Sequence, residues 1–216
     1  MTGKIKLVHS GGNSVSVAVP TNAPSASEVE FKLPQSDGSA NEVLKTDGSG
    51  NLSFVAQPTG GLANVVQFRL YQNVQQDNAN ANETLTHWEK SDETGAGQIG
   101  TFADPSSGVF TFPSTGIWRF DYNVQILSTY ASGTRYFSSR ISATTDDSSY
   151  SFRTNTRTVA QDGEYEFIAS HYIFDVSNVS THKVKFIVRG QDGNVYYRGS
   201  TTENETYVTF MRLGDT

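Results

Sequence analysis

The chain has 216 residues and a formal net charge of −6, from 16 basic and 22 acidic side chains, and it has no cysteine. A surface that binds nucleic acid needs clustered basic residues, and here the lysines and arginines are scattered along the sequence, so we expect no nucleic-acid partner. Disulfides and thiolate chemistry are excluded. No apolar run approaches the roughly 20 residues of a membrane span. Residues 1–9 lack the apolar stretch of a secretory signal, so we expect synthesis in a cytoplasm without membrane insertion.

The composition favours a β-rich fold built from short strands. Hydrophobic residues make up 36% of the chain, yet aromatic residues reach 12%, and there are 19 glycines against 6 prolines. Large rings can fill a thin core, and glycine supplies turns between short strands. The length is sufficient for one β-sandwich with a short additional segment.

The first 61 residues are predicted to form a docking arm of short strands and turns that ends at Gly60-Gly61. Apolar and polar residues alternate over residues 15–19 and 29–33, which is the period of a strand with one apolar face. A strand of five residues cannot bury that face alone, so the arm must pack on a partner. The residues expected to make this contact are Val15, Val17, Val19, Phe31, Leu33, Leu52 and Phe54.

Two related segments, DGSAN at residues 37–41 and DGSGN at residues 47–51, lie ten residues apart in the arm. Asp-Gly and Gly-Asn pairs supply the positive φ angles of tight turns, so both segments are interpreted as hairpin turns. A calcium loop is the alternative, but the segments have few acidic residues and lack the bidentate glutamate of such a loop.

Residues 62–216 are predicted to form an antiparallel sandwich. The clearest strand places Trp118, Phe120, Tyr122, Val124 and Ile126 on one face and polar residues between them. The polar stretch at residues 75–83 has no apolar stripe and is interpreted as a loop. Repeated short strands with Gly, Asp and Asn turns and no helical pattern indicate an all-β, antiparallel fold.

The segment GVFTFPSTGIWRF at residues 108–120 resembles the C1q/TNF-like pattern, in which G-x-F-x-x-P-x-x-G precedes an aromatic-x-Phe strand. Pro113 and Gly116 would turn one strand into the next, and Trp118 and Phe120 would enter the core. Residues 207–213 resemble the last strand of that family. The resemblance covers residues 62–213 and implies a ten-strand jelly roll that assembles as a homotrimer.

The arm resembles the leader segments of structural proteins from marine and cyanobacterial bacteriophages. The residues that carry this resemblance are LVHSGGN at 7–13, FKLP at 31–34 and VLKTDGSGNLSF at 43–54. The resemblance implies a virion structural protein whose arm binds other virion proteins. Two roles remain open, a short tail fibre for host attachment and a capsid decoration (cement) trimer on the outer shell.

Catalytic chemistry is not supported by the residue pattern. The four histidines are dispersed, and Ser170, His171 and Asp175 lie within one expected strand, whereas a catalytic triad converges from separate segments. Paired carboxylates in suitable strands are also missing, which disfavours the remaining enzyme hypothesis, a virion-associated glycan-degrading enzyme. We therefore expect no enzyme, no cofactor and no metal centre.

Binding by loops is the remaining chemical possibility. Asp146 and Asp147 stand beside serine and threonine hydroxyls and are the best calcium candidates, with a solvated turn as the alternative. Loops rich in Ser, Thr, Asn, Gly and Tyr suit recognition of a host surface glycan or protein, and they are also ordinary loop composition. The receptor-loop candidates are Tyr130, Arg135, Asp146, Asp147, Tyr150, Asn194 and Tyr196.

A trimer contact is expected on the face of the Trp118 strand that does not fill the core. That face would show Ile117, Arg119, Asp121 and Asn123, and Arg119 and Asp121 could form ion pairs between subunits, because buried charges need partners. Core packing is the alternative for each further candidate. These further candidates are Tyr172, Phe174, Tyr207 and Met211.

Overall fold

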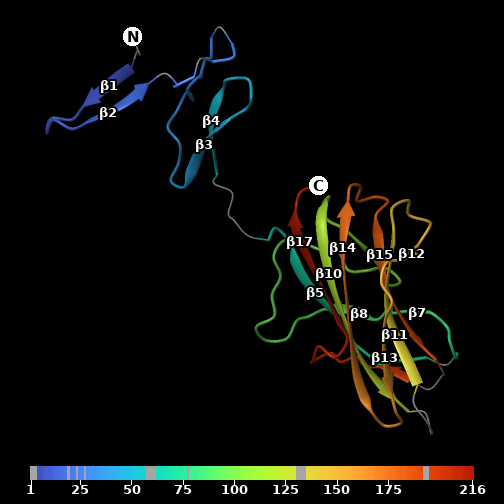
Figure 1. Cartoon of the computed structure of the whole chain (residues 1–216). Coiled ribbons are helices and arrows are strands. Elements are labelled where there is room, and N and C mark those ends of the chain that lie inside the picture. Colours follow the sequence, from blue (N-terminus) through green and yellow to red (C-terminus); the bar gives the residue numbers. More distant parts are fainter. Residues whose placement is uncertain are drawn as a thin grey trace. The chain divides into compact units, whose positions relative to one another are not determined.

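The computed structural model describes residues 4–18, 20–22, 24–26, 28–56, 62–76, 78–129, 135–191 and 195–216. The chain divides into two compact units, Met1–Gly60 and Gly61–Thr216. Every helix or strand assigned within the described ranges is a β-strand, and these residues contain no helix that could span a membrane. Figure 1 shows the strands of both units.

The larger unit is a sandwich of two antiparallel sheets. The seven-stranded sheet has the order β6-β16-β10-β17-β5-β8, with β14 also paired to β10. Its strands are β5 (Val65–Leu70), β6 (Val74–Gln76), β8 (Trp88–Lys90), β10 (Gly116–Ser128), β14 (Tyr165–Val176), β16 (Val195–Tyr197) and β17 (Tyr207–Gly214).

The six-stranded sheet has the order β12-β11-β15-β7, with β13 also paired to β11 and β9 also paired to β15. Its strands are β7 (Glu83–Thr84), β9 (Val109–Thr111), β11 (Arg135–Thr144), β12 (Ser151–Phe152), β13 (Thr156–Ala160) and β15 (Lys183–Gly190). The predicted all-β, antiparallel sandwich is confirmed. Several of the strands have only two or three residues, which is why more than ten are assigned.

The core lies between the sheets and is dominated by aromatic rings. The alternating apolar residues of β10, from Trp118 to Ile126, are all fully buried. Phe210 of β17 stands at the centre, with its ring centroid 4.8–6.3 Å from six other rings. These rings belong to Phe68, Phe102, Phe110, Phe112, Phe120 and Phe186. Edge-to-face and tilted contacts of this kind add to the hydrophobic effect of burial.

Glycine permits the sharp entry into β10 that the GVFTFPSTGIWRF segment predicts. Gly116 has a φ of 137°, and a Cβ at this position would lie 2.5 Å from the Gly214 carbonyl oxygen. Only glycine accommodates both the backbone conformation and the close approach of β17.

The stretch at residues 75–83 is not entirely a loop, which corrects the prediction. Gln75 and Gln76 belong to β6, and Glu83 begins β7. Gln76 is buried, and its side-chain amide forms hydrogen bonds in the core. Its Nε2 donates to the Gly190 carbonyl at 3.2 Å, and its Oε1 accepts from the Gly190 N–H at 2.8 Å and from the Tyr197 hydroxyl at 2.9 Å. A buried polar side chain is tolerated where its hydrogen bonds are satisfied.

The described part of the smaller unit contains two hairpins. β1 (Lys4–Val8) pairs with β2 (Ser14–Ala18), and β3 (Glu42–Thr46) pairs with β4 (Leu52–Ala56). The turn at residues 47–51 joins β3 to β4, and the Asp47 carboxylate accepts hydrogen bonds from the N–H groups of Ser49 and Asn51. The Asn51 side-chain amide also donates to Asp47 Oδ2, and this hydrogen bond, together with those from the N–H groups, lowers the pKa of Asp47.

Two predictions for the smaller unit need correction. The turn at residues 37–41 leads into β3 and does not join two paired strands in the described part of the arm. Residues 29–33 do not form a strand, although Lys32 pairs with Asn51 as an isolated bridge. Phe31 and Leu33 are exposed there because no neighbouring strand covers them.

Truncation at the centre of the core tests the packing. Phe210→Ala should lower the free energy of unfolding by about 3–5 kcal/mol, since it leaves a cavity among six rings. Phe152→Ala, at a half-exposed ring, should cost less than about 1 kcal/mol. Denaturant unfolding followed by tryptophan fluorescence at one fixed protein concentration measures both. Equal losses for the two variants would contradict this account of the core.

Candidate functional site: the outer face of the seven-stranded sheet

The seven-stranded sheet has an outer face that points away from the core, and strand register decides which residues share it. Directly opposed residues in an antiparallel pair point to the same side of the sheet. Arg119 is opposite both Ile173 of β14 and Met211 of β17, and Met211 is opposite Val65 of β5. The residues on either side of Arg119 in β10 are fully buried, so this row of four faces outward.

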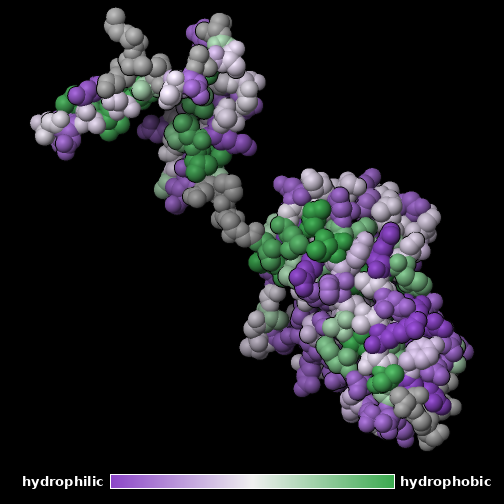
Figure 2. All heavy atoms as spheres, in the orientation of Figure 1, coloured by the Kyte–Doolittle hydropathy of each residue, from purple (hydrophilic) through white to green (hydrophobic). Residues whose placement is uncertain are grey.

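Apolar side chains occupy both margins of the outer face. The β14 margin consists of Tyr165, Phe167 and Ile173, each at least 50% exposed. The β17 margin consists of Val65, Ile99, Met211 and Leu213, of which Ile99 and Leu213 are about half exposed. Figure 2 shows hydrophobic residues gathered on the larger unit at the end of the sheet where β17 runs to the C-terminus. Large exposed apolar groups of this kind mark interaction surfaces.

A polar stripe on β10 separates the two margins. It consists of Arg119, Asp121, Asn123 and Gln125, which alternate with the buried core residues of the strand. Arg119 Nε lies 2.9 Å from Asp121 Oδ1, so the two charges are paired within one chain. Arg119 and Asp121 were expected to form ion pairs between subunits, and in the structure they form an ion pair with each other.

A polar cluster closes the outer face at the β5–β8 edge. Arg69 is 1% exposed, and its guanidinium forms ion pairs with Glu89 at 2.8 Å, with Glu93 at 2.7 Å and with Asp92. Burial opposes the charge of Arg69, but the hydrogen bond and charge of Glu89 and the charges of Asp92 and Glu93 raise the pKa of Arg69 overall. This cluster is a structural feature that the sequence pattern did not reveal.

Six of the predicted interface residues do lie on the outer face. Their positions follow from the pairing of β10 with β14 and β17: Ile117, Arg119, Asp121, Asn123, Tyr207 and Met211. Tyr172 and Phe174 require a correction, because they are opposite Phe120 and Trp118 and therefore point inward. Phe174 belongs to the core and Tyr172 packs against it, so the alternative of core packing applies to both.

The described receptor-loop candidates do not form one site. Asp146, Asp147 and Tyr150 follow the last residue of β11, whereas Arg135 is its first residue. Ten strand residues, about 30 Å, separate these ends. Tyr196 lies opposite Leu127 on β10. Tyr130 and Asn194 lie outside the described residues.

The Asp146 carboxylate forms hydrogen bonds within its own turn. Its Oδ1 accepts hydrogen bonds from the Ser149 N–H at 2.7 Å, the Ser148 N–H at 2.9 Å and the Thr144 hydroxyl at 2.7 Å, and these bonds lower the pKa of Asp146. Among the described residues, no group of three or more His, Asp or Glu side chains could hold a metal ion. The hydrogen bonds of Asp146 thus fit a solvated turn.

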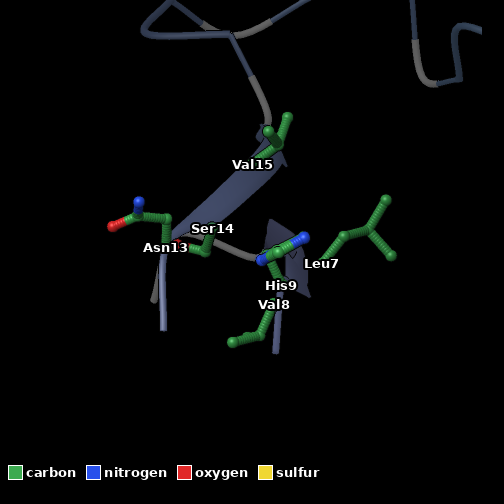
Figure 3. Close-up of a pocket in the computed structure, with 6 residues that line it drawn as sticks. All are labelled: Leu7, Val8, His9, Asn13, Ser14 and Val15. Atoms are coloured by element: carbon green, nitrogen blue, oxygen red, sulfur yellow. The ribbon is translucent and has the colours of Figure 1, made fainter. Parts of the chain in front are cut away.

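The predicted docking-arm residues are exposed in part. Ile5 is opposite Val17 and Leu7 is opposite Val15 in the β1–β2 hairpin, so one face of this hairpin is apolar and exposed. Figure 3 shows the pocket at its turn, with Leu7, Val8 and Val15 among the lining residues. Phe31, Leu33 and Phe54 are also exposed and Leu52 is half-buried, whereas Val19 lies outside the described residues.

No family model matches the chain, and no curated protein matches it. Its fold is similar to that of murine APRIL at pH 8.5, with 12% identity, a TM-score of 0.48 and coverage of 69% of this chain and 98% of that chain. The globular domain of zebrafish complement 1qA protein has 11% identity and a TM-score of 0.44, with coverage of 72% and 100%. The PRD1 vertex protein P5 has 12% identity and a TM-score of 0.42, with coverage of 83% and 86%. At these identities the similarity is one of fold alone.

Removing the cation of the polar cluster should destabilise the larger unit. Arg69→Met leaves three carboxylates without their shared partner and should lower the free energy of unfolding by about 3 kcal/mol. Arg119→Met removes an exposed ion pair and should cost less than about 1 kcal/mol. Denaturant unfolding compares the two, and a loss for Arg69→Met no larger than that for Arg119→Met would refute a structural role for the cluster.

Proposed function

We propose that this chain is a non-catalytic virion structural protein whose copies assemble as a homotrimer through the outer face of the seven-stranded sheet. The observation that carries the proposal is the pair of exposed apolar margins on that face. Each half-exposed Phe, Tyr, Ile or Leu side chain would gain roughly 1 kcal/mol on full burial, at about 25 cal/mol per Å² of apolar surface.

The arrangement of the outer face favours a ring over a two-fold dimer. In a two-fold contact the same patch meets itself, which would bring the polar stripe of one copy against that of the other. In a ring, the β14 margin of one copy meets the β17 margin of the next, and the internally paired charges of Arg119 and Asp121 line the space between them. Three copies close such a ring, in agreement with the trimer that the C1q/TNF-like resemblance implies.

The smaller unit is proposed to attach the trimer to the particle. A two-stranded hairpin is marginally stable alone, and the β1–β2 hairpin leaves Ile5, Leu7, Val15 and Val17 exposed on one face. Other virion proteins would cover this face, as the resemblance to phage leader segments suggests.

We place the trimer on the tail as a short fibre that contacts the host. Electron microscopy of virions tests that place, and copies found on the outer shell would instead identify a capsid decoration protein.

A charge placed on one apolar margin should break the trimer. Ile173→Glu puts a carboxylate into the proposed contact and should reduce the mass in solution from that of three chains to that of one at micromolar concentration. Val159→Glu is a matched control, because Val159 is 56% exposed and Ile173 is 55% exposed, but Val159 belongs to the six-stranded sheet. Light scattering measures the mass. A trimeric Ile173→Glu variant would exclude this face as the contact.

Charges on the hairpin should prevent attachment and leave the trimer intact. The double variant Leu7→Asp and Val15→Asp should reduce incorporation into virions at least about tenfold, since two carboxylates would have to be desolvated. Ser16→Asp changes the opposite side of the same hairpin and should be incorporated normally. Quantitative mass spectrometry of purified particles compares them. Normal incorporation of the double variant would mean that another part of the chain makes the attachment.

A further inference from the structure

The outer face of the six-stranded sheet gathers arginines that are far apart in the sequence. Arg157 of β13 and Arg189 of β15 are both directly opposite Ser138 of β11, so they flank it on the same side of the sheet. Arg140 is two residues further along β11 and therefore points to that side as well. Three guanidinium groups from three neighbouring strands thus share one surface.

These arginines have neutral partners. No carboxylate among the described residues forms an ion pair with Arg140, Arg157 or Arg189, although the chain has 22 acidic residues. Arg189 donates to the backbone oxygen and to Oδ1 of Asn80, both at 2.9 Å. The Arg157 guanidinium lies 5.6 Å from the centroid of the Tyr136 ring.

Arg140 is the most unusual member of the group, because it is only 7% exposed and has no counter-charge among the described residues. Its guanidinium donates to Oδ1 of Asn82 at 2.7 Å and to Oδ1 of Asn155 at 3.3 Å, and it lies 4.8 Å from the Phe152 ring centroid. Burial lowers the pKa of Arg140, and the charges of Arg189 and Arg157 lower it further. A buried charge is normally paired with an opposite charge. An anionic group of a ligand would supply the negative charge that Arg140 lacks among the described residues.

The amides and rings hold the guanidinium groups in place without neutralising them. A fixed guanidinium presents parallel N–H donors that match the oxygens of a carboxylate, sulfate or phosphate group. Lys185 and Lys183 of β15 face the same way as Arg189 and lie up to six residues, about 20 Å, from it. The Lys185 ammonium lies 3.9 Å from the Tyr150 ring centroid and has a neutral partner, whereas Lys183 forms an ion pair with Asp147. Lys183 and Lys185 line a pocket of about 440 Å³, together with Tyr150, Asp147, Asp104, Ser106, Val109 and Thr111.

We propose that this surface, which we call the arginine face (Arg140, Arg157, Arg189 and Lys185), binds an acidic polysaccharide along β15. The arginines would bind its oxyanion groups, and the amides and hydroxyls around them would bind its sugar hydroxyls. Nucleic acid fits less well, because the chain carries a net charge of −6 and guanidinium groups already lie near the rings of Tyr136 and Phe152, on which bases would stack. The site lies on the opposite sheet from the trimer contact and does not depend on it.

Binding of defined oligomers to the full-length protein tests the proposal. The probes are a heparin decasaccharide, an oligogalacturonate of similar length, a neutral dextran oligomer and a single-stranded DNA of similar charge, each measured by titration calorimetry at low and at physiological salt. The sulfated and carboxylated probes distinguish which acidic group the site prefers. We expect at least one acidic oligosaccharide to bind with an affinity that falls as salt rises, and dextran not to bind.

Variants assign the binding to the arginine face. Arg157→Gln and Arg189→Gln are at partly exposed positions and keep a polar side chain, and each should weaken binding on the order of tenfold, as expected for loss of charged hydrogen bonds. Lys45→Gln removes one positive charge from the smaller unit and should leave the affinity unchanged. Light scattering confirms that the variants keep the wild-type mass, so that failure of the trimer and failure of this site are told apart.

Three results would overturn the proposal. The first is an absence of binding by both acidic oligosaccharides. The second is an affinity that is the same in wild type and in Arg157→Gln and Arg189→Gln. The third is tighter binding of DNA than of either acidic oligosaccharide, which would assign the arginine face to nucleic acid.

Discussion

The register of β10 against β14 and β17 is the constraint on which the rest of the structure depends. Because side chains alternate along a strand, this register sends five large apolar residues of β10 into the core and places the polar stripe outside. The same pairing puts Phe174 and Phe210 in the core and leaves Ile173 and Met211 on the outer face. A slip of one residue in β10 would exchange the two sets and remove both the core and the two apolar margins.

The two sheets present different chemistry to their surroundings. The seven-stranded sheet has apolar margins around charges that are paired internally, which is suited to burial against another copy. The six-stranded sheet has arginines whose partners are neutral, which is suited to a soluble or surface-bound anion. If three copies associate through the first sheet, the second sheets face outward, so that weak sites on each copy act together on a repetitive polysaccharide.

The sequence alone predicts features that depend on local pattern. The alternation from Trp118 to Ile126, the turn at Gly116 and the hairpin turn at residues 47–51 are all encoded within a few residues, and each is found in the structure. The β17 residues Tyr207 and Met211 lie on the outer face and not in the core, and their role in a contact between copies stays a prediction.

Features that depend on strand order were not predictable. The side to which Phe174 points follows from its pairing with Trp118, which lies far away in the chain. The arginine face combines residues 140, 157 and 189, so in the sequence its members look like scattered charges. The carboxylates around Arg69 come from β8 and from the loop after it, and only the folded chain brings them to β5. In each case the missing information is which strands are neighbours.

The most direct test of the central claim is the mass of the unsubstituted full-length protein in solution, measured by light scattering over a range from nanomolar to high micromolar concentration. Burial of the two margins between copies predicts a species of three times the chain mass of 23.6 kDa that persists as the protein is diluted into the micromolar range. A single species of 23.6 kDa at every concentration would show that the margins stay exposed, and would contradict the account.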